Sequence, residues 1–325
     1  MRLTRRLALA VAPLAGLVAG VAWWRGASRA DSAGLDARLA MPLPAPPGPM
    51  AVFHLGHSLV NRDMPAMLAQ LAGDGHRYDS QLGWGTTLKA HWGDDTITGF
   101  AEENDHPRFR PAHDAIASGS YDAVILTEMV EIRAALRWFE SPEYFFRWAD
   151  KALTARPDTR LYLYETWHAL DDPEGWLDRL DADLQRYWLD GIAKPALARL
   201  HPDASLHIIP AGQVLAAFVR AVEAKGGVGN VATRTDLFAK DADGKLDQIH
   251  LNDMGNYLVA LTHFTVLYHQ SPIGRPHEMR RADGSLADAP APETALLMQQ
   301  TVLTVVQSLP ITGVSQLSTA ESRQD

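Results

Sequence analysis

Met50-Ala-Val-Phe-His-Leu-Gly-His-Ser-Leu59 is an apolar run that ends in a glycine and a serine. A short apolar run predicts a buried strand, and Gly56 permits a tight turn directly after it. Four further runs are β-leaning in the same way: Tyr78–Leu82, Tyr121–Thr127, Arg160–Thr166 and Ser205–Pro210. Helical patterns lie at 62–73, 110–118, 142–155, 176–200, 212–225, 253–269 and 293–308. Strands alternating with helices predict an α/β fold with a parallel sheet covered on both faces.

Composition limits the chemistry that the protein can use. The chain has 325 residues, a net charge of −9 and no cysteine, which excludes disulfides, thiolate metal sites and a cysteine nucleophile. Nothing in the composition of this acidic chain suggests the basic face that nucleic acids require. The 13 histidines form no H-E-x-x-H pattern, so we expect neither a catalytic metal nor another cofactor.

The two ends of the chain differ from its body. Arg2, Arg5 and Arg6 precede an apolar run from Leu7 to Trp24, which predicts an export signal or a retained membrane anchor over residues 1–30. Either form places the body in the periplasm or outside the cell, and residues 7–24 would supply any attachment to the inner membrane. We predict a Pro-rich linker over 31–49, one domain over 50–309 and a flexible tail over 310–325.

Polar or glycine-rich motifs follow each of the first four predicted strands. They are Ser58, then Gly83-Trp84-Gly85, then Glu128, and then Trp167-His168. In open parallel sheets the working site lies beyond the carboxyl ends of the strands. The sequence therefore predicts that these motifs meet at one edge of the sheet.

Asp247-Gln-Ile-His250 lies after the fifth predicted strand, beyond a helix and a long loop. With Ser58 it supplies a hydroxyl nucleophile, an imidazole base and an acid that orients the base. Each residue also has a plain structural alternative: Ser58 as a helix N-cap, and the Asp–His pair as an ion pair or turn cap. Asn252 or Asp253 can cap the helix that follows, which leaves Asp247 free for other work.

Two other motifs have weaker implications. The glycines of Gly83-Trp84-Gly85 let a peptide N–H approach a ligand closely, as an oxyanion donor must. His91 and Trp92 lie about one helical turn after this motif, where their side chains either line a pocket or pack in the core. Asp241-Ala-Asp243-Gly244 resembles the start of a calcium loop, but without the later ligands it is better interpreted as a turn.

These motifs together resemble a known enzyme superfamily. Gly56-His57-Ser58-Leu59 resembles the first block of the SGNH (GDSL-type) hydrolases, with His57 where Asp commonly stands, and Asp247-Gln-Ile-His250 matches their D-x-x-H block. The middle of the chain is most similar to the DUF4886 branch. It matches in Gly85-Thr-Thr-Leu-Lys-Ala-His-Trp92, in Leu126-Thr-Glu128 and in Thr166-Trp167. The resemblance covers roughly residues 50 to 270.

The resemblance implies a three-layer, flavodoxin-like α/β/α sandwich with a central five-stranded parallel sheet. It also implies a Ser–His–Asp triad without metal, and an oxyanion hole built from the N–H groups of Ser58 and Gly85 with an asparagine after the third strand. That asparagine is missing here. Thr127 can offer a hydroxyl in its place, and Glu128 can donate if burial keeps it protonated.

The function we expect is an exported serine esterase that hydrolyses acyl esters, with acetyl favoured and carbohydrate as the carrier. The candidate substrate-binding residues around the triad are His57, Trp84, His91, Trp167 and His168. Two alternatives stay open. One is acyl transfer at the same site, and the other is a non-catalytic glycan-binding or assembly protein on a degenerate scaffold. We expect a small-molecule or glycan ester as the partner, and no nucleic acid.

Overall fold

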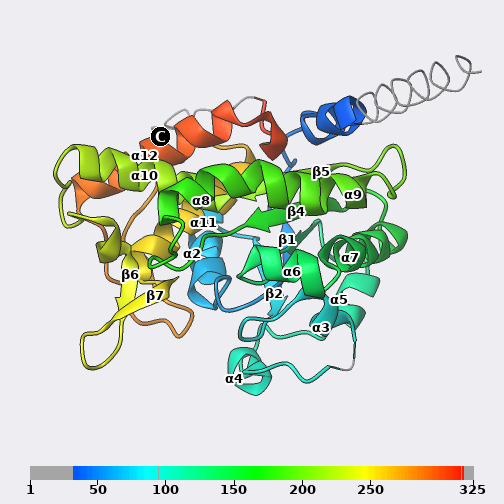
Figure 1. Ribbon diagram of the computed structural model, residues 1–325, viewed down its shortest axis with the longest axis horizontal. Coiled ribbons are helices and arrows are strands. Elements are labelled where there is room, and N and C mark those ends of the chain that lie inside the picture. The colour runs from blue at the N-terminus through cyan, green and yellow to red at the C-terminus, as the bar shows by residue number, and fades with distance from the viewer. Residues whose placement is uncertain (1–31, 94, 316, 318–325) are drawn as a thin grey trace, which may run out of the picture.

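The computed structural model describes residues 32–93, 95–315 and 317, so the predicted export signal or anchor lies outside the described residues. A five-stranded sheet forms the centre of the molecule (Figure 1). Its strands are all parallel, in the order β2-β1-β3-β4-β5. Their bounds are β1 Ala51–Leu55, β2 Arg77–Gln81, β3 Ala123–Leu126, β4 Arg160–Glu165 and β5 Leu206–Pro210. The predicted five-stranded parallel sheet is therefore confirmed.

Alternate side chains of the strands enter two separate cores. In β1, Ala51, Phe53 and Leu55 join one core and Val52 joins the other. The Val52 side is covered by α2 (Asp63–Ala72), α10 (Ala211–Ala224), α11 (Asp253–Tyr268) and α12 (Pro292–Ser308). The Phe53 side is covered by α5 (Ala112–Ala117), α7 (Ser141–Ala155), a π-helical segment (Leu184–Ala193) and α9 (Lys194–Leu197). Helices on both faces make the three-layer sandwich that was predicted.

Several short elements were not predicted. They are α3 (Leu88–Trp92), α4 (Phe100–Asn104) and α6 (Ile132–Trp138). None is long enough to show a helical repeat of apolar residues. The single predicted helix over 176–200 is instead α8 (Trp176–Asp183) followed by the π-helical segment and α9.

An antiparallel hairpin lies outside the main sheet, at the lower left of Figure 1. It consists of β6 (Phe238–Lys240), which lies where the long loop was expected, and β7 (Leu246–Leu251), which carries Asp247 and His250. The motif at 241–244 is the turn that joins them, closed by a 2.9 Å hydrogen bond from the Gly244 N–H to the Asp241 carbonyl. The interpretation of that motif as a turn is confirmed, and the two strands that it joins were not predicted.

The described parts of both ends pack against the domain, which differs from the predicted linker and tail. Residues 32–39 are helical, and Leu39 is buried. The Leu43 N–H donates to the Gly313 carbonyl at 2.8 Å, and Arg160 donates to the Pro44 carbonyl. Residues 310–312 form a short 3-10 helix in which Thr312 is fully buried. None of the described helices combines the length and apolar character needed to cross a membrane.

Candidate active site

Ser58 lies in a turn just beyond the carboxyl end of β1. A Cβ atom at Gly56 would stand 2.4 Å from the Thr127 Cγ2, so only glycine lets the chain pass this close to β3. The turn is closed by a 2.8 Å hydrogen bond from the Val60 N–H to the His57 carbonyl. Helix α2 begins later, and the Asn61 Oδ1 accepts from its first N–H groups. Ser58 is therefore not the cap of this helix, and its hydroxyl faces another partner.

That partner is His250. The His250 Nε2 lies 2.9 Å from the Ser58 Oγ, and its Nδ1 lies 2.9 Å from the Asp247 Oδ2. The other carboxylate oxygen of Asp247 accepts from the backbone N–H groups of Ile249, at 2.8 Å, and His250, at 2.9 Å. Because the carboxylate accepts at Nδ1, the Nε2 lone pair faces the Ser58 hydroxyl. The structure thus brings together the three residues that the sequence singled out.

The Asp247 carboxyl stays ionised in this setting. Partial burial acts to raise its pKa, but donation from the His250 and Ile249 N–H groups and from the imidazole outweighs burial and lowers the pKa. The side chains of His250 and Asp247 are 43 % and 36 % exposed, so the base is open to a ligand that approaches from solvent. A negative Asp247 can then stabilise an imidazolium formed on His250.

The loop after β4 and helix α11 hold β7 in place. The Trp167 Nε1 donates to the Ile249 carbonyl at 2.7 Å, and the Leu170 N–H donates to the Gln248 carbonyl at 2.8 Å. At the far end of the strand, the Asn252 side chain caps α11 by accepting from the Gly255 N–H at 3.1 Å. These contacts fix the backbone on both sides of His250.

A pocket of about 710 Å³ opens beside Ser58 and His250. Its walls are mostly apolar and include a single carboxylate side chain. The lining residues are His57, Ser58, Leu59, Asn61, Trp84, Gly85, Glu103, Val130, Ala169, Ile249 and His250. The volume is that of a small-molecule site.

Two backbone N–H groups in this pocket can serve an oxyanion. Gly85 has a φ of +55°, which glycine adopts without strain. Within the described part of the chain, the N–H groups of Ser58 and Gly85 donate to no other residue. Both residues line the pocket, so these donors remain available to a ligand.

The third predicted oxyanion donor is not at Thr127 or Glu128, and that prediction was wrong. The Thr127 hydroxyl donates to the Tyr164 carbonyl at 2.7 Å, and the residue is 1 % exposed. The fully buried Glu128 carboxyl accepts from the Met129 N–H at 2.8 Å and, at 3.4 Å, from the Leu88 N–H at the start of α3. Burial raises the Glu128 pKa to about 7. Neither residue lines the pocket.

His57 and His91 brace the serine turn. The His57 Nε2 donates to the Glu128 carbonyl at 2.9 Å and its Nδ1 accepts from the Leu59 N–H at 3.3 Å. His91 contacts the Gly56 carbonyl at 2.8 Å through Nε2 and the Gln81 side chain at 2.9 Å through Nδ1. Burial lowers both pKa values to about 4, so both rings are neutral. His57 lines the pocket with its ring nitrogens occupied, whereas His91 does not reach it.

The remaining predicted binding residues separate into two groups. Trp84 lines the pocket and is 48 % exposed. Trp167 and His168 are buried outside it, so their predicted role in substrate binding was wrong. Trp167 holds β7, and the His168 Nε2 lies 2.9 Å from the Asp183 Oδ2. A strand end gives the position of a residue, but not the direction of its side chain.

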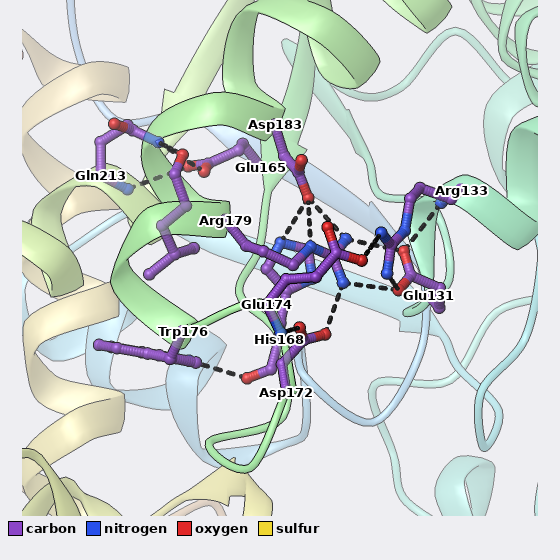
Figure 2. A network of polar contacts seen from close by, with 11 residues as sticks. Glu131, Arg133, Glu165, His168, Asp172, Glu174, Trp176, Arg179, Asp183 and Gln213 are labelled. Atoms are coloured by element: carbon purple, nitrogen blue, oxygen red, sulfur yellow. Dashed lines mark hydrogen bonds and ion pairs between the residues drawn. The ribbon is translucent and has the colours of Figure 1, made fainter.

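Figure 2 shows a polar network in which Arg179 contacts several carboxylates. The Arg179 guanidinium, whose side chain is 4 % exposed, contacts Glu131 at 2.6 and 2.8 Å, Asp172 at 2.6 Å and Asp183 at 2.6 Å. Glu131 follows a pocket residue of the loop after β3, and Asp172 lies in the loop after β4 that carries Ala169. One cation thereby ties together two loops that line the pocket.

Sequence patterns did not indicate six of the lining residues: Leu59, Asn61, Glu103, Val130, Ala169 and Ile249. Five of them lie inside or within three residues of a motif that was singled out, so nearness in the chain was an available signal. Glu103, on α4, had none. Within the described residues, no three His, Asp or Glu side chains gather in a way that could hold a metal ion.

Two solved structures are similar to this chain at low sequence identity. No protein-family model matches this chain, and no curated protein sequence matches it. Among solved structures, a DUF4886 family protein from Bacteroides uniformis is 16 % identical, with a TM-score of 0.45 over 79 % of this chain and 94 % of that chain. A gut microbial diltiazem-metabolizing enzyme is 11 % identical, with a TM-score of 0.39 over 71 % of this chain and half of that chain.

Proposed function

We propose that this protein is an SGNH-type serine esterase that hydrolyses acyl esters, acetyl esters among them. One observation carries the proposal: His250 lies 2.9 Å from both the Ser58 Oγ and the Asp247 Oδ2, beside an open pocket. Both separations are within the reach needed for proton transfer. The structural alternative, in which Asp247 and His250 form only an ion pair, does not explain why the second imidazole nitrogen faces the Ser58 hydroxyl.

The proposed reaction has two halves. The Ser58 Oγ bonds to the ester carbonyl carbon while its proton passes to the His250 Nε2. The ester C–O bond then breaks, and the leaving alkoxide takes that proton to form the alcohol. In the second half, His250 removes a proton from water, whose oxygen attacks the acyl-enzyme. The carboxylic acid departs, and His250 returns its proton to Ser58.

The negative oxygen formed in each half needs hydrogen-bond donors. The N–H groups of Ser58 and Gly85 are the two that the pocket offers from the predicted set. Removing one oxyanion donor from a serine hydrolase costs roughly 100- to 1,000-fold in rate. We therefore propose an enzyme that works with two backbone donors and is slower than one with three.

Export to the periplasm or beyond remains part of the proposal, on the basis of Arg2 and the apolar run after it. The carbohydrate carrier does not remain part of it. It was expected because Trp84, His91, Trp167 and His168 could form a sugar-stacking rim, and all of them except Trp84 are buried outside the pocket.

A direct test combines turnover with covalent labelling. The purified protein is given p-nitrophenyl esters of increasing acyl length and, separately, a fluorophosphonate probe. Wild type should hydrolyse the acetate and take up the probe at Ser58, whereas Ser58→Ala and His250→Ala should each lose at least about 1,000-fold in kcat. Ser308→Ala, which removes an exposed hydroxyl at the end of α12, is the matched control. Equal turnover in wild type and Ser58→Ala would end the esterase proposal.

A further inference from the structure

The pocket beside Ser58 carries an unbalanced negative charge. Glu103 is the one carboxylate among its lining residues, and no lysine or arginine is among them. Glu103 forms no salt bridge with any described residue. Asp247 adds a second carboxylate directly behind His250. A ligand in this pocket therefore meets negative potential, which favours a cation and disfavours an anion.

Arg62, a cation that contacts the backbone of α4, serves another purpose. Arg62 donates to the Glu102 carbonyl at 2.7 Å and to the Asp105 carbonyl at 3.4 Å. Arg62 and Glu102 line a separate hollow, outside the pocket that contains Ser58. The guanidinium thus fixes the backbone of α4 and leaves the Glu103 carboxylate without an ionic partner.

Trp84 and Glu103 form one unit in the pocket wall. The Trp84 Nε1 donates to the Glu103 Oε1 at 2.8 Å, and the other carboxylate oxygen has no partner among the described residues. The indole is packed against Gly99, where a Cβ atom would lie 2.2 Å from the ring, yet it remains 48 % exposed. A fixed, half-exposed indole beside a carboxylate is the pairing that recognises alkylammonium groups, through the ring face and the negative charge together.

The indole also stands next to an oxyanion donor. Trp84 and Gly85 are consecutive, so their Cα atoms are about 3.8 Å apart. Both residues line the same pocket, so an ester whose carbonyl accepts from the Gly85 N–H can extend its alcohol portion toward the indole. We infer that the pocket selects esters whose alcohol portion carries an ammonium group on a short spacer. This inference rests on the proposed esterase function and names its substrate class.

The kinetic test uses two esters of the same shape. Acetylcholine and 3,3-dimethylbutyl acetate differ in a quaternary nitrogen that is replaced by carbon. Wild type should favour acetylcholine in kcat/KM by about tenfold, the size expected of one cation–π and carboxylate contact. Glu103→Gln should bring the ratio close to one, and high salt should lower it in wild type. Equal kcat/KM for the two esters in wild type would overturn the inference.

Glu102→Gln is the matched control, because it removes the same charge one residue away and outside the pocket. This variant should keep the tenfold preference. A preference lost equally in Glu102→Gln and Glu103→Gln would mean that only the net charge of α4 matters, which contradicts recognition by the Trp84–Glu103 unit.

A binding measurement separates this inference from the proposed function. Calorimetry with acetylcholine uses Ser58→Ala, which cannot turn the ester over, and the same variant with Glu103→Gln added. Binding that weakens about tenfold in the double variant supports ammonium recognition even if no hydrolysis is found. If wild type shows no turnover of p-nitrophenyl acetate that depends on Ser58, the esterase proposal ends and this inference stands. Absent acetylcholine binding together with intact turnover ends this inference alone.

Discussion

Asp247 uses its two carboxylate oxygens for two different tasks. Oδ1 accepts from the Ile249 and His250 N–H groups and so fixes the backbone, while Oδ2 accepts from the imidazole and fixes the ring. The three-residue spacing in Asp247-Gln-Ile-His250 makes both contacts possible within one turn of chain. These local hydrogen bonds hold the His250 ring in place, so it does not need a packed core around it and can remain partly exposed.

Asp247→Asn separates the two tasks. The amide can keep its oxygen on the backbone N–H groups, but it presents an NH₂ group to the Nδ1 of His250. The ring must then carry its proton on Nε2, which prevents it from accepting the Ser58 proton. We expect kcat for p-nitrophenyl acetate to fall on the order of 10³- to 10⁴-fold, with a nearly unchanged unfolding temperature. Asp241→Asn, in the hairpin turn, is the control, and a loss below tenfold in Asp247→Asn would contradict the assigned role.

Sequence patterns correctly predicted that the triad side chains would meet. They did not predict the direction of other side chains that follow strands. Ser58 and His250 are 192 positions apart, and a shared sheet edge was enough to bring them together. Thr127 also follows a strand, but its hydroxyl turns to the Tyr164 carbonyl on the neighbouring strand β4. That choice depends on the distance and register of another strand, which no local pattern contains. Glu103 was missed because it lies on a short helix without any motif.

At the scale of elements, the long apolar strands were predictable and the hairpin was not. Each of the five strands matches its predicted run to within two residues at either end. The pattern was clearest for β3 and β5, because a buried parallel strand is a near-continuous apolar run, and weakest for the mostly polar edge strand β2. The strand β7 mixes polar and apolar residues without strict alternation, and all but its last residue are half-buried. Its extended form depends on β6 and on the loop after β4, which are contacts distant in sequence.

The contact between Trp167 and β7 can be tested by a pair of substitutions. Trp167→Phe removes the donor to the Ile249 carbonyl, and Trp176→Phe removes an equivalent buried donor to the His168 carbonyl at 2.9 Å. Both variants should lose about 1–3 kcal/mol of unfolding free energy for a buried carbonyl left without its partner. Only Trp167→Phe should also lower kcat, by about tenfold or more, because only it loosens the strand that carries His250. Equal kcat in the two variants would show that the indole does not position the base.

At the scale of the whole molecule, the interior is rich in neutral histidine. Besides the less deeply buried His106, seven imidazoles have pKa values that burial lowers, six of them to about 4 and His54 well below its ordinary value. They are His54, His57, His76, His91, His207, His263 and His269. Two buried carboxyls act in the opposite direction, since burial raises the pKa of Glu128 to about 7 and of Glu165 to about 8. Because the imidazoles outnumber the two carboxyls, they determine the sign of the pH dependence of stability.

The sign of the resulting pH dependence follows from proton binding. Below pH 6.5 the unfolded chain protonates its histidines, whereas the folded protein keeps these seven neutral until the pH approaches 4. Their stabilisation is therefore complete above pH 6.5 and is lost as the pH falls toward 4, at about 1.4 kcal/mol per pH unit for each group. The two carboxyls bind protons in the folded state over the same range and offset part of the loss. We expect urea unfolding to show a free energy that declines steadily from pH 7 to pH 4.5.

A substitution in the core can assign this slope to the buried rings. His263 is fully buried on α11, with its Nδ1 2.9 Å from the Val259 carbonyl. His263→Phe changes the absolute stability through packing, but it also removes one group that must stay neutral. Its free energy of unfolding should therefore fall less steeply with pH than that of wild type, by about 1.4 kcal/mol per pH unit between pH 6 and 4.5. His201→Phe, at a ring that is 73 % exposed, should keep the wild-type slope. Parallel slopes in all three proteins would mean that other groups cause the acid sensitivity.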